Sequence, residues 1–270
     1  DELTINLRTL SDRAGVAFVE AEIIGIDPVA KLLHLKGRPS LRYGLLSLNV
    51  GSVTRLTAEG MPINPLEPAL AYLAQQSPEE SQPFRVIGAG AAGVEVVLAL
   101  RRRWPKRPLQ LQLRDGQLPD AVERIMRQSQ IELITSTIPW SGPSLLCTGS
   151  HNPSWLRRSK LPLNHDGRVK TNKCLRVVGH EGIFASGDCA VIGDAERPAS
   201  GVWAVRAAKP LARNLEATCL GETLRQWQPQ EHALQLIGNY QGKAWARWWR
   251  WRSPAVSLLW KWKKQIDNQF

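Results

Sequence analysis

The sequence predicts an α/β fold in which helices cover parallel β-sheets, and three observations support this prediction. An apolar strand, FRVI (84–87), leads into the glycine turn GAGAAG (88–93) and then into a helix. From residue 84 to residue 134 short strands and helices alternate, as they do in a parallel sheet covered by helices. Two later apolar segments, PSLLCTGS (143–150) and EGIFASGDCA (181–190), read as strands that each end in a glycine turn.

The part of the chain before the glycine turn predicts strands followed by a connecting segment. Apolar runs separated by turn residues predict strands within residues 15–27, 32–37 and 42–52. Residues 53–83 are richer in Pro and Ser, with one helix expected at LEPALAYLAQQ (66–76). This composition indicates a connection between two domains.

The remaining helices and strands are predicted from the spacing of apolar residues and from the Gly, Pro and other turn residues between them. Strands are expected at 84–88, 109–115 and 131–134, and helices at 94–104 and 119–130. Two further helices are expected around 200–217 and 254–267.

Composition indicates an ordinary globular protein rather than a membrane-spanning or disulfide-bonded one. The chain has 270 residues, of which 43% are hydrophobic and 22% charged. No uninterrupted apolar stretch approaches the roughly eighteen residues of a membrane span, and no signal peptide opens the chain. The four cysteines form no C-x-x-C pair, and neither they nor the five histidines have the spacing of a metal site. We therefore expect a cytoplasmic location and no bound metal.

The glycine turn predicts a dinucleotide site. Gly88 permits the tight turn, Gly90 lets a pyrophosphate approach the backbone, and Gly93 lets the helix pack close to the strand. The helix that follows directs free N–H groups and a positive dipole at the phosphates. NADH or NADPH is the expected ligand, and a tight turn without a ligand is the alternative.

The end of the second strand carries the residues that distinguish the two nicotinamide cofactors. Asp115 is placed to bind the ribose 2′-hydroxyl of NADH, whereas its neighbour Arg114 suits the 2′-phosphate of NADPH. Asp115 also precedes Gly116, so it equally fits a plain turn. The pair leaves the choice of cofactor open, with Asp115 favouring NADH.

The segment GIFASGDCA (182–190) resembles the G-x-F-A-x-G-D element of the two-dinucleotide-binding flavoproteins, which include the pyridine nucleotide–disulfide oxidoreductases and type II NADH dehydrogenases. In that family the strand ends at FAD, and the aspartate binds the ribityl or pyrophosphate region. The resemblance therefore implies FAD as a second cofactor, held by Gly187 and Asp188.

Other segments extend the resemblance along the chain. LLSLNVGS (45–52) and LLCTGS (145–150), which contains Gly149, resemble the crossings between the FAD and NAD domains. Glu95 lies where the family often places a carboxylate near the nicotinamide–flavin contact. SGVWAVRAAKPLARNL (200–215) resembles a helix whose start, around Val202, points at the flavin's pyrimidine edge. The ending LLWKWKKQIDNQF (258–270) is similar to FAD oxidoreductase modules often fused to selenophosphate synthetase, which implies such a partner.

Three departures from the family pattern are visible. The family's N-terminal βαβ unit, which binds the ADP half of FAD, has no counterpart, so the fold is expected to be N-terminally truncated. The connection from the strand at 131–134 to the strand near 145 is shorter than the family's β-meander. Arg206 lies near the position where type II dehydrogenases carry a Gln facing the quinone.

The resemblance implies four regions. Residues 1–83 form a partial FAD domain and linker, residues 84–144 an NAD(P)H-binding domain, and residues 145–235 the second part of the FAD domain. Residues 236–270 form a basic, tryptophan-rich segment, and from residue 241 onward they hold seven Lys or Arg against one Asp and six of the eleven tryptophans. This segment is expected either to lie peripherally on the inner face of a membrane or to pack against the flavin domain or a fused partner. Nucleic acid is not an expected partner, because no recognition module accompanies the tryptophans.

The expected function is an FAD-dependent NAD(P)H oxidoreductase. It passes a hydride from NAD(P)H to the flavin, and the electrons go on to a quinone or another small acceptor. The alternative is a truncated, catalytically inactive member that serves as a nucleotide-binding or interaction module.

Overall fold

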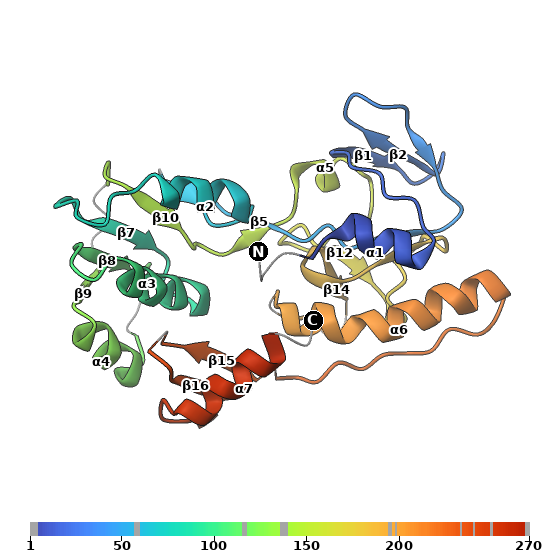
Figure 1. The fold of residues 1–270 in the computed structure, drawn as a ribbon. Coiled ribbons are helices and arrows are strands. Elements are labelled where there is room, and N and C mark those ends of the chain that lie inside the picture. The colour runs from blue at the N-terminus through green and yellow to red at the C-terminus, as the bar shows by residue number, and fades with distance from the viewer. Residues whose placement is uncertain are drawn as a thin grey trace.

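The chain folds into two lobes joined by a short two-stranded link (Figure 1). The computed structural model describes residues 5–56, 60–114, 118–135, 140–193, 196–197, 199–232, 234–239, 241–248 and 251–267. The link pairs β5 (Val53–Thr54) with β11 (Ser150–His151) in antiparallel register. The chain therefore enters and leaves the first lobe side by side.

The first lobe is built on a five-stranded parallel sheet, as the alternation of strands and helices predicts. Its order is β6-β10-β7-β8-β9, and all four neighbouring pairs are parallel. The strands are β6 (Met61–Pro62), β7 (Phe84–Ile87), β8 (Leu109–Gln112), β9 (Ile131–Ile134) and β10 (Ser144–Leu146). The helices are α2 (Leu66–Ala74), α3 (Ala91–Arg103) and α4 (Asp120–Gln128). All of these helices and the strands β7, β8 and β9 confirm elements predicted from sequence.

One face of this sheet carries the core of the lobe. The connections through α2, α3 and α4 all run in the same direction across the sheet, so right-handed crossovers put all three helices on one face. Phe84, Val86 and Leu111 point into this core and are fully buried. Phe84 also packs edge-on against Trp104, with ring centroids 5.1 Å apart.

The opposite face of the same strands is polar. Arg85 Nε donates to Gln110 Oε1 at 2.9 Å, and Gln110 Nε2 donates to Glu132 Oε2 at 2.8 Å. The short connection from β9 to β10 supplies Trp140, whose ring lies 4.0 Å from the Arg85 guanidinium carbon. A polar row, with the Trp140 ring stacked on Arg85, therefore lies on this face of the sheet.

The second lobe combines small sheets with the long helix α6 (Gly201–Leu220) (Figure 1). Its strands are β1 (Ile23–Asp27), β2 (Leu32–Leu35), β3 (Leu41–Arg42), β4 (Leu46–Leu48), β12 (Val169–Thr171), β13 (Ile183–Ala185) and β14 (Ala190–Ile192). The first three form an antiparallel sheet, while β4 pairs with β13 and β12 pairs with β14 in parallel register. A short helix, α5 (Ser154–Arg157), and the 3-10 turn η1 (Gly187–Cys189) complete the lobe.

In the first fifty residues, β1, β2 and β4 confirm strands predicted from sequence, and the part before residue 23 differs from the prediction. Helix α1 (Leu7–Ala14) opens the described chain, and residues 15–22 belong to no strand. Asn6 caps this helix by accepting a hydrogen bond from Thr9 N at 3.0 Å, and Gly15 ends it in the left-handed conformation. No residue of α1 is buried, so local capping rather than a core-facing apolar stripe defines it.

The C-terminal segment folds as a small module, of which the helix was predicted from sequence and the three strands were not. The strands β15 (Gln235–Gly238), β16 (Ala244–Trp248) and β17 (Trp251–Arg252) form an antiparallel sheet, and α7 (Ser257–Asp267) packs against it. We call these four elements the C-terminal module. Ile237 and Trp245 join the core of the first lobe and β15 contacts α3, so the module packs against the first lobe (Figure 1). Packing against the flavin domain, one of the alternatives expected for it, is not what the structure has; contact with a membrane or a fused partner stays a prediction.

Within the described residues, no helix combines the length and apolar character that crossing a bilayer requires.

Candidate functional site

Two of the three glycines in the turn after β7 are required by packing, and the third faces open space. A Cβ on Gly93 would lie 1.8 Å from the Gly88 carbonyl oxygen, so the helix sits directly on the strand end. Gly88 has φ +108°, and a Cβ there would lie 2.4 Å from the Cys147 carbonyl oxygen. A Cβ on Gly90 would meet no atom within 4 Å.

This arrangement leaves the start of α3 accessible. Gly90 is the N-cap residue of α3 and offers no side chain to the first-turn N–H groups. A helix N-terminus with free N–H groups is an anion-binding site, and the glycine lets an anion come close to the backbone. The geometry thus suits the pyrophosphate of a dinucleotide.

The two residues predicted to choose between NADH and NADPH lie just beyond β8. Arg114 is exposed, two residues after the strand ends at Gln112. Asp115 lies outside the described residues.

Asp188 lies in η1, the turn that follows β13, and has one carboxylate oxygen without a partner. Its Oδ2 accepts a hydrogen bond from Ser52 Oγ at 3.4 Å, whereas its buried Oδ1 has no hydrogen-bond partner. Gly187 has φ +70°, and a Cβ there would lie 2.4 Å from Asn49 Oδ1. The β4 turn and the β13 turn therefore meet at this carboxylate.

A buried carboxylate oxygen is costly unless it accepts a hydrogen bond, so this atom fits a hydroxyl-bearing ligand such as the ribityl chain of FAD. Ser52 and Asn49 are part of this site, and sequence reasoning did not single them out. Both lie in LLSLNVGS, where a polar residue on either side of a glycine turn was the available signal.

Val202 lies on the helix that packs against η1, the turn that holds Asp188, whereas Gly149 lies at the link between the lobes. Val202 is half-buried in the first turn of α6, which packs against η1. The N-cap residue Ser200 makes no side-chain cap, so the start of α6 is also open. Gly149 has φ +84° and open space around it, and its carbonyl accepts a hydrogen bond from Arg55 N at 3.0 Å.

Glu95, predicted at the nicotinamide–flavin contact, holds the C-terminal module. Its Oε1 accepts a hydrogen bond from Gly238 N at 2.9 Å and lies 3.4 Å from Lys263 Nζ. The two side chains of this ion pair are only 20% and 23% exposed. Neither Gly238 nor Lys263 was identified from sequence, because both reach Glu95 from more than 140 residues away.

Replacing Glu95 with Ala is expected to loosen the C-terminal module. The change removes an acceptor from a backbone N–H and an ionic partner from Lys263, at a cost of about 1–3 kcal/mol. Hydrogen exchange of β15 should therefore accelerate, while exchange of β7 and β8 stays slow. The control is Glu123→Ala, which removes a more exposed ion pair with Arg127 on α4. Unchanged exchange of β15 in the Glu95 variant would contradict this role.

The cysteines near these sites are not poised for thiol chemistry. Burial raises the pKa of the Cys147 thiol to about 12, and it also raises the pKa of the Cys189 thiol. Both therefore stay protonated at neutral pH. Among the described residues, no three His, Cys, Asp or Glu side chains gather as a metal ion would require.

Comparison with known proteins adds relatives over most of the chain. The Xenopus laevis protein named ferroptosis suppressor protein 1 is 23% identical over 296 residues, which cover 91% of this chain and 78% of that protein. The structure of an FAD-dependent pyridine nucleotide-disulphide oxidoreductase from Desulfovibrio vulgaris matches with a TM-score of 0.69 at 20% identity, covering 87% of this chain and 69% of that one. The sulfide:quinone oxidoreductase of Aquifex aeolicus matches with a TM-score of 0.72 at 15% identity, covering 100% of this chain and 78% of that one. No protein-family model matches the chain.

These likenesses agree with the parallel sheets and the two glycine signatures. They confirm the resemblance inferred from sequence: the chain has the α/β fold of the two-dinucleotide-binding flavoproteins, the fold of the FAD-dependent pyridine nucleotide–disulfide oxidoreductases.

Proposed function

We propose that the protein is an FAD-dependent NAD(P)H oxidoreductase that passes electrons to a quinone or another small acceptor. The observation that carries this proposal is the buried, unpartnered Oδ1 of Asp188 in η1, the turn that follows β13. A carboxylate oxygen in this state is suited to accept a hydrogen bond from a polyol hydroxyl. Two of the similar structures, an FAD-dependent oxidoreductase and a sulfide:quinone oxidoreductase, support the same choice.

The residues divide between two cofactors. Gly88, Gly90 and Gly93, with the start of α3, would hold the NAD(P)H pyrophosphate, and Arg114 with Asp115 would contact its ribose. Gly187 and Asp188, with Gly149 and Val202, would hold and orient FAD. When bound, the flavin supplies the chemistry by accepting a hydride from the nicotinamide.

The chain's own contribution is placement and exclusion of water. Glu95 would border the nicotinamide from α3, and its contacts with Gly238 and Lys263 would fix the C-terminal module as one wall. The two lobes would correspond to the predicted division, with residues 84–144 binding NAD(P)H and residues 1–83 and 145–235 providing the FAD side.

The acceptor and the partners are a further part of the proposal. Arg206 is exposed on α6 and donates a hydrogen bond to Gln230 Oε1, so it would not repeat the contact that a Gln makes with quinone in type II dehydrogenases. On α7, Leu258 is 73% and Trp262 44% exposed. These side chains lie beside the exposed Lys261 and Lys264, and they would serve either peripheral contact with an anionic membrane or association with a selenophosphate synthetase-like protein.

A second candidate function follows from the sheet beside Asp188. Among the described residues, β4 and β13 form a two-stranded parallel sheet with no third strand. Parallel sheets are normally larger and covered on both faces. This favours, as the alternative, a module that binds nucleotide or a partner without catalysis.

A spectroscopic experiment distinguishes the FAD-dependent oxidoreductase from the non-catalytic module. The purified full chain is incubated with FAD, desalted, and then mixed anaerobically with NADH or NADPH. Retained flavin absorbance that bleaches within seconds is the expected result, and the faster of the two reductants identifies the cofactor. A colourless protein after desalting would favour the non-catalytic module.

A further inference from the structure

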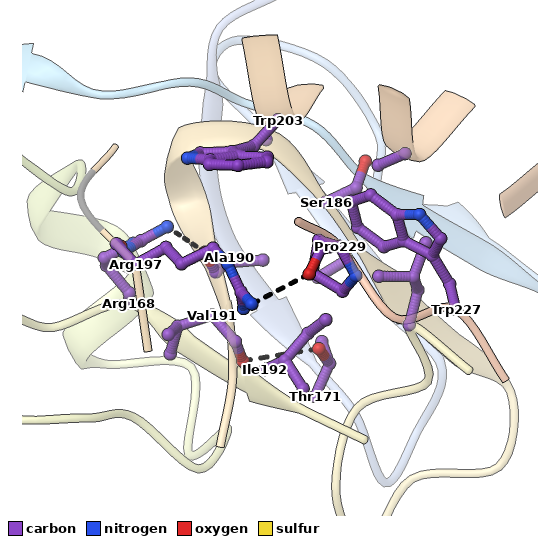
Figure 2. A pocket seen from close by; sticks show the side chains of 14 residues that line it. Arg168, Thr171, Ser186, Ala190, Val191, Ile192, Arg197, Trp203, Trp227 and Pro229 are labelled. Atoms are coloured by element: carbon purple, nitrogen blue, oxygen red, sulfur yellow. Dashed lines mark hydrogen bonds between the residues drawn. The ribbon is translucent and has the colours of Figure 1, made fainter. Parts of the chain in front are cut away.

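The hollow behind the start of α6 is too small for an organic ligand (Figure 2). Its cavity volume is about 50 Å³, far below the roughly 300–1,000 Å³ of pockets that hold such ligands. Its two arginines already bind backbone carbonyls, since Arg168 donates to Ala190 O and Arg197 donates to Pro229 O. The cations of this hollow therefore stabilise the chain and are not directed at a ligand.

A different cation, Arg55, lies exposed at the link between the lobes, and its charge is available to an anion. Arg55 N donates to Gly149 O at 3.0 Å, and Arg55 O accepts a hydrogen bond from Thr148 Oγ1. These two contacts fix the backbone that carries the guanidinium. The guanidinium itself makes no hydrogen bond or ion pair within the described ranges of the chain.

His151 lies on the same face of the link as Arg55. His151 pairs with Val53 in the register of β5 and β11, and the hydrogen bond from Arg55 to Gly149 continues this register. Residues two apart along a strand share a face, and diagonal neighbours across a strand pair lie about 7–8 Å apart. Arg55 and His151 are such diagonal neighbours, and Gly149 places no side chain between them.

One nitrogen of the His151 imidazole lacks a hydrogen-bond partner. His151 Nδ1 is buried, and no atom of the chain bonds to it. The ring as a whole is half-buried, so rotation about its χ2 bond can present this nitrogen to a ligand. Phosphate oxygens bind a guanidinium through paired hydrogen bonds and also accept from an imidazole N–H. A phosphate group beside the link would therefore satisfy both side chains.

The link adjoins the glycine turn of the proposed NAD(P)H site. A Cβ on Gly88 would lie 2.4 Å from Cys147 O and 3.1 Å from Thr148 N, so the turn packs directly on the segment that leads into the link. Thr148 in turn bonds to the Arg55 carbonyl. Arg55 is thus one contact away from the segment on which the glycine turn packs.

The opposite face of the link belongs to the proposed FAD site. Ser52 precedes Val53, so its side chain is directed to the other face of the strand. There Ser52 Oγ donates to Asp188 Oδ2 at 3.4 Å. The link therefore separates the two cofactor sites, and Arg55 and His151 lie on the face directed away from Asp188.

We propose that Arg55 and His151 form a second anchor for the pyrophosphate of the nicotinamide dinucleotide. The inference rests on the proposed function, because it takes the glycine turn as the NAD(P)H site. The N–H groups at the start of α3 would hold one side of the pyrophosphate, and the Arg55 guanidinium the other. Both NADH and NADPH carry this group, so Arg55 would raise the affinity for both and would not select between them.

Isothermal titration calorimetry of the full chain with ADP-ribose measures this contact without a nicotinamide or a flavin. Arg55→Gln should weaken ADP-ribose binding at least about tenfold, because charge-assisted hydrogen bonds are lost. Arg55→Lys keeps the charge and should bind within about threefold of the parent. His151→Phe keeps a ring but removes the nitrogen, and it should weaken binding about fivefold. Arg124→Gln, which removes an exposed cation on α4, is the matched control and should bind as the parent does.

Two further readouts distinguish a ligand contact from a structural role of Arg55. The affinity of the parent for ADP-ribose should fall between about 0.05 M and about 0.3 M NaCl, because salt screens an exposed ionic contact. This fall should be smaller in Arg55→Gln. Retention of FAD after desalting should be the same in Arg55→Gln and in the parent, because the link separates Arg55 from Asp188.

The proposal is overturned if ADP-ribose does not bind the parent chain, or if Arg55→Gln binds it as tightly as Arg124→Gln does. It is also overturned if Arg55→Gln loses FAD in place of ADP-ribose, or if only inorganic pyrophosphate binds in an Arg55-dependent way. The exposed position of Arg55 makes its variants expected to fold, which circular dichroism verifies. A failure of NADH to bleach bound flavin, with Arg55-dependent ADP-ribose binding intact, would instead remove the proposed function and leave this contact.

Discussion

Gly93→Ala is expected to lower the free energy of unfolding by about 3 kcal/mol. The new Cβ would lie 1.8 Å from the Gly88 carbonyl oxygen, a backbone atom of the turn itself, so α3 must move off β7 to relieve the overlap. Because α3 also supplies Val94, Val97 and Leu98 to the core of the first lobe, this movement opens the packing. Urea unfolding of the two proteins at one concentration measures the difference.

The same substitution three residues earlier is the matched control. Gly90 has φ −68°, which alanine adopts without strain, and its Cβ would meet no protein atom. Gly90→Ala should therefore unfold within about 0.5 kcal/mol of the parent, yet bind NADH or NADPH at least about tenfold more weakly, because the methyl group occupies the path of the pyrophosphate. Equal destabilisation by both substitutions would show that the turn has no ligand-facing side. If Gly90→Ala left nucleotide affinity unchanged, the dinucleotide would not bind at this glycine turn.

Asp188→Asn is expected to abolish most FAD retention with little effect on the fold. The carboxylate loses its charge and one acceptor atom, and a hydrogen bond to a charged group contributes about 1.5–3 kcal/mol, so FAD affinity should fall at least about tenfold. The apoprotein loses attraction toward Arg168 but is also relieved of a buried, unpartnered oxygen. These effects oppose each other, and the unfolding free energy should change by less than about 1 kcal/mol.

Titration of FAD against the apoprotein, followed by quenching of flavin fluorescence, checks this expectation. Asp166→Asn is the control, since Asp166 also lies near Arg168 but its side chain is 51% exposed. It should leave FAD affinity unchanged. If Asp188→Asn retained FAD as well as the control does, the unpartnered oxygen would not be a flavin contact.

The first lobe was predictable because its signals are local. An apolar strand, a glycine turn and a helix follow one another within twenty residues, and Gly88 and Gly93 are needed by the backbone geometry itself. Helix α1 was not predicted because it is only eight residues long, and although Leu7 and Leu10 share one face, neither is buried.

The remaining parts of the site depend on contacts between distant segments. The carboxylate of Glu95 meets the N–H of Gly238, 143 residues later, and nothing in either local sequence marks that pairing. The C-terminal tryptophans suggested a membrane surface or the flavin domain, whereas Trp245 is buried in the core of the first lobe. Composition predicted that this segment is basic and rich in tryptophan, but it did not predict which part of the protein the segment packs against. That contact is visible only in the folded structure.

The path of the chain between the lobes restricts how the molecule can move. The chain crosses at β5, returns at β11, and crosses a third time after α6, along residues 221–232, to reach the C-terminal module (Figure 1). Glu95 on α3 then holds the module through its hydrogen bond with Gly238 N and its ion pair with Lys263. A rotation that separates the two lobes must therefore either extend the segment that follows α6 or break the contacts of Glu95 with the C-terminal module. Undocking of the module and opening of the lobes are thus thermodynamically linked, and a ligand that bridges the two lobes would tighten a contact at the far end of the chain.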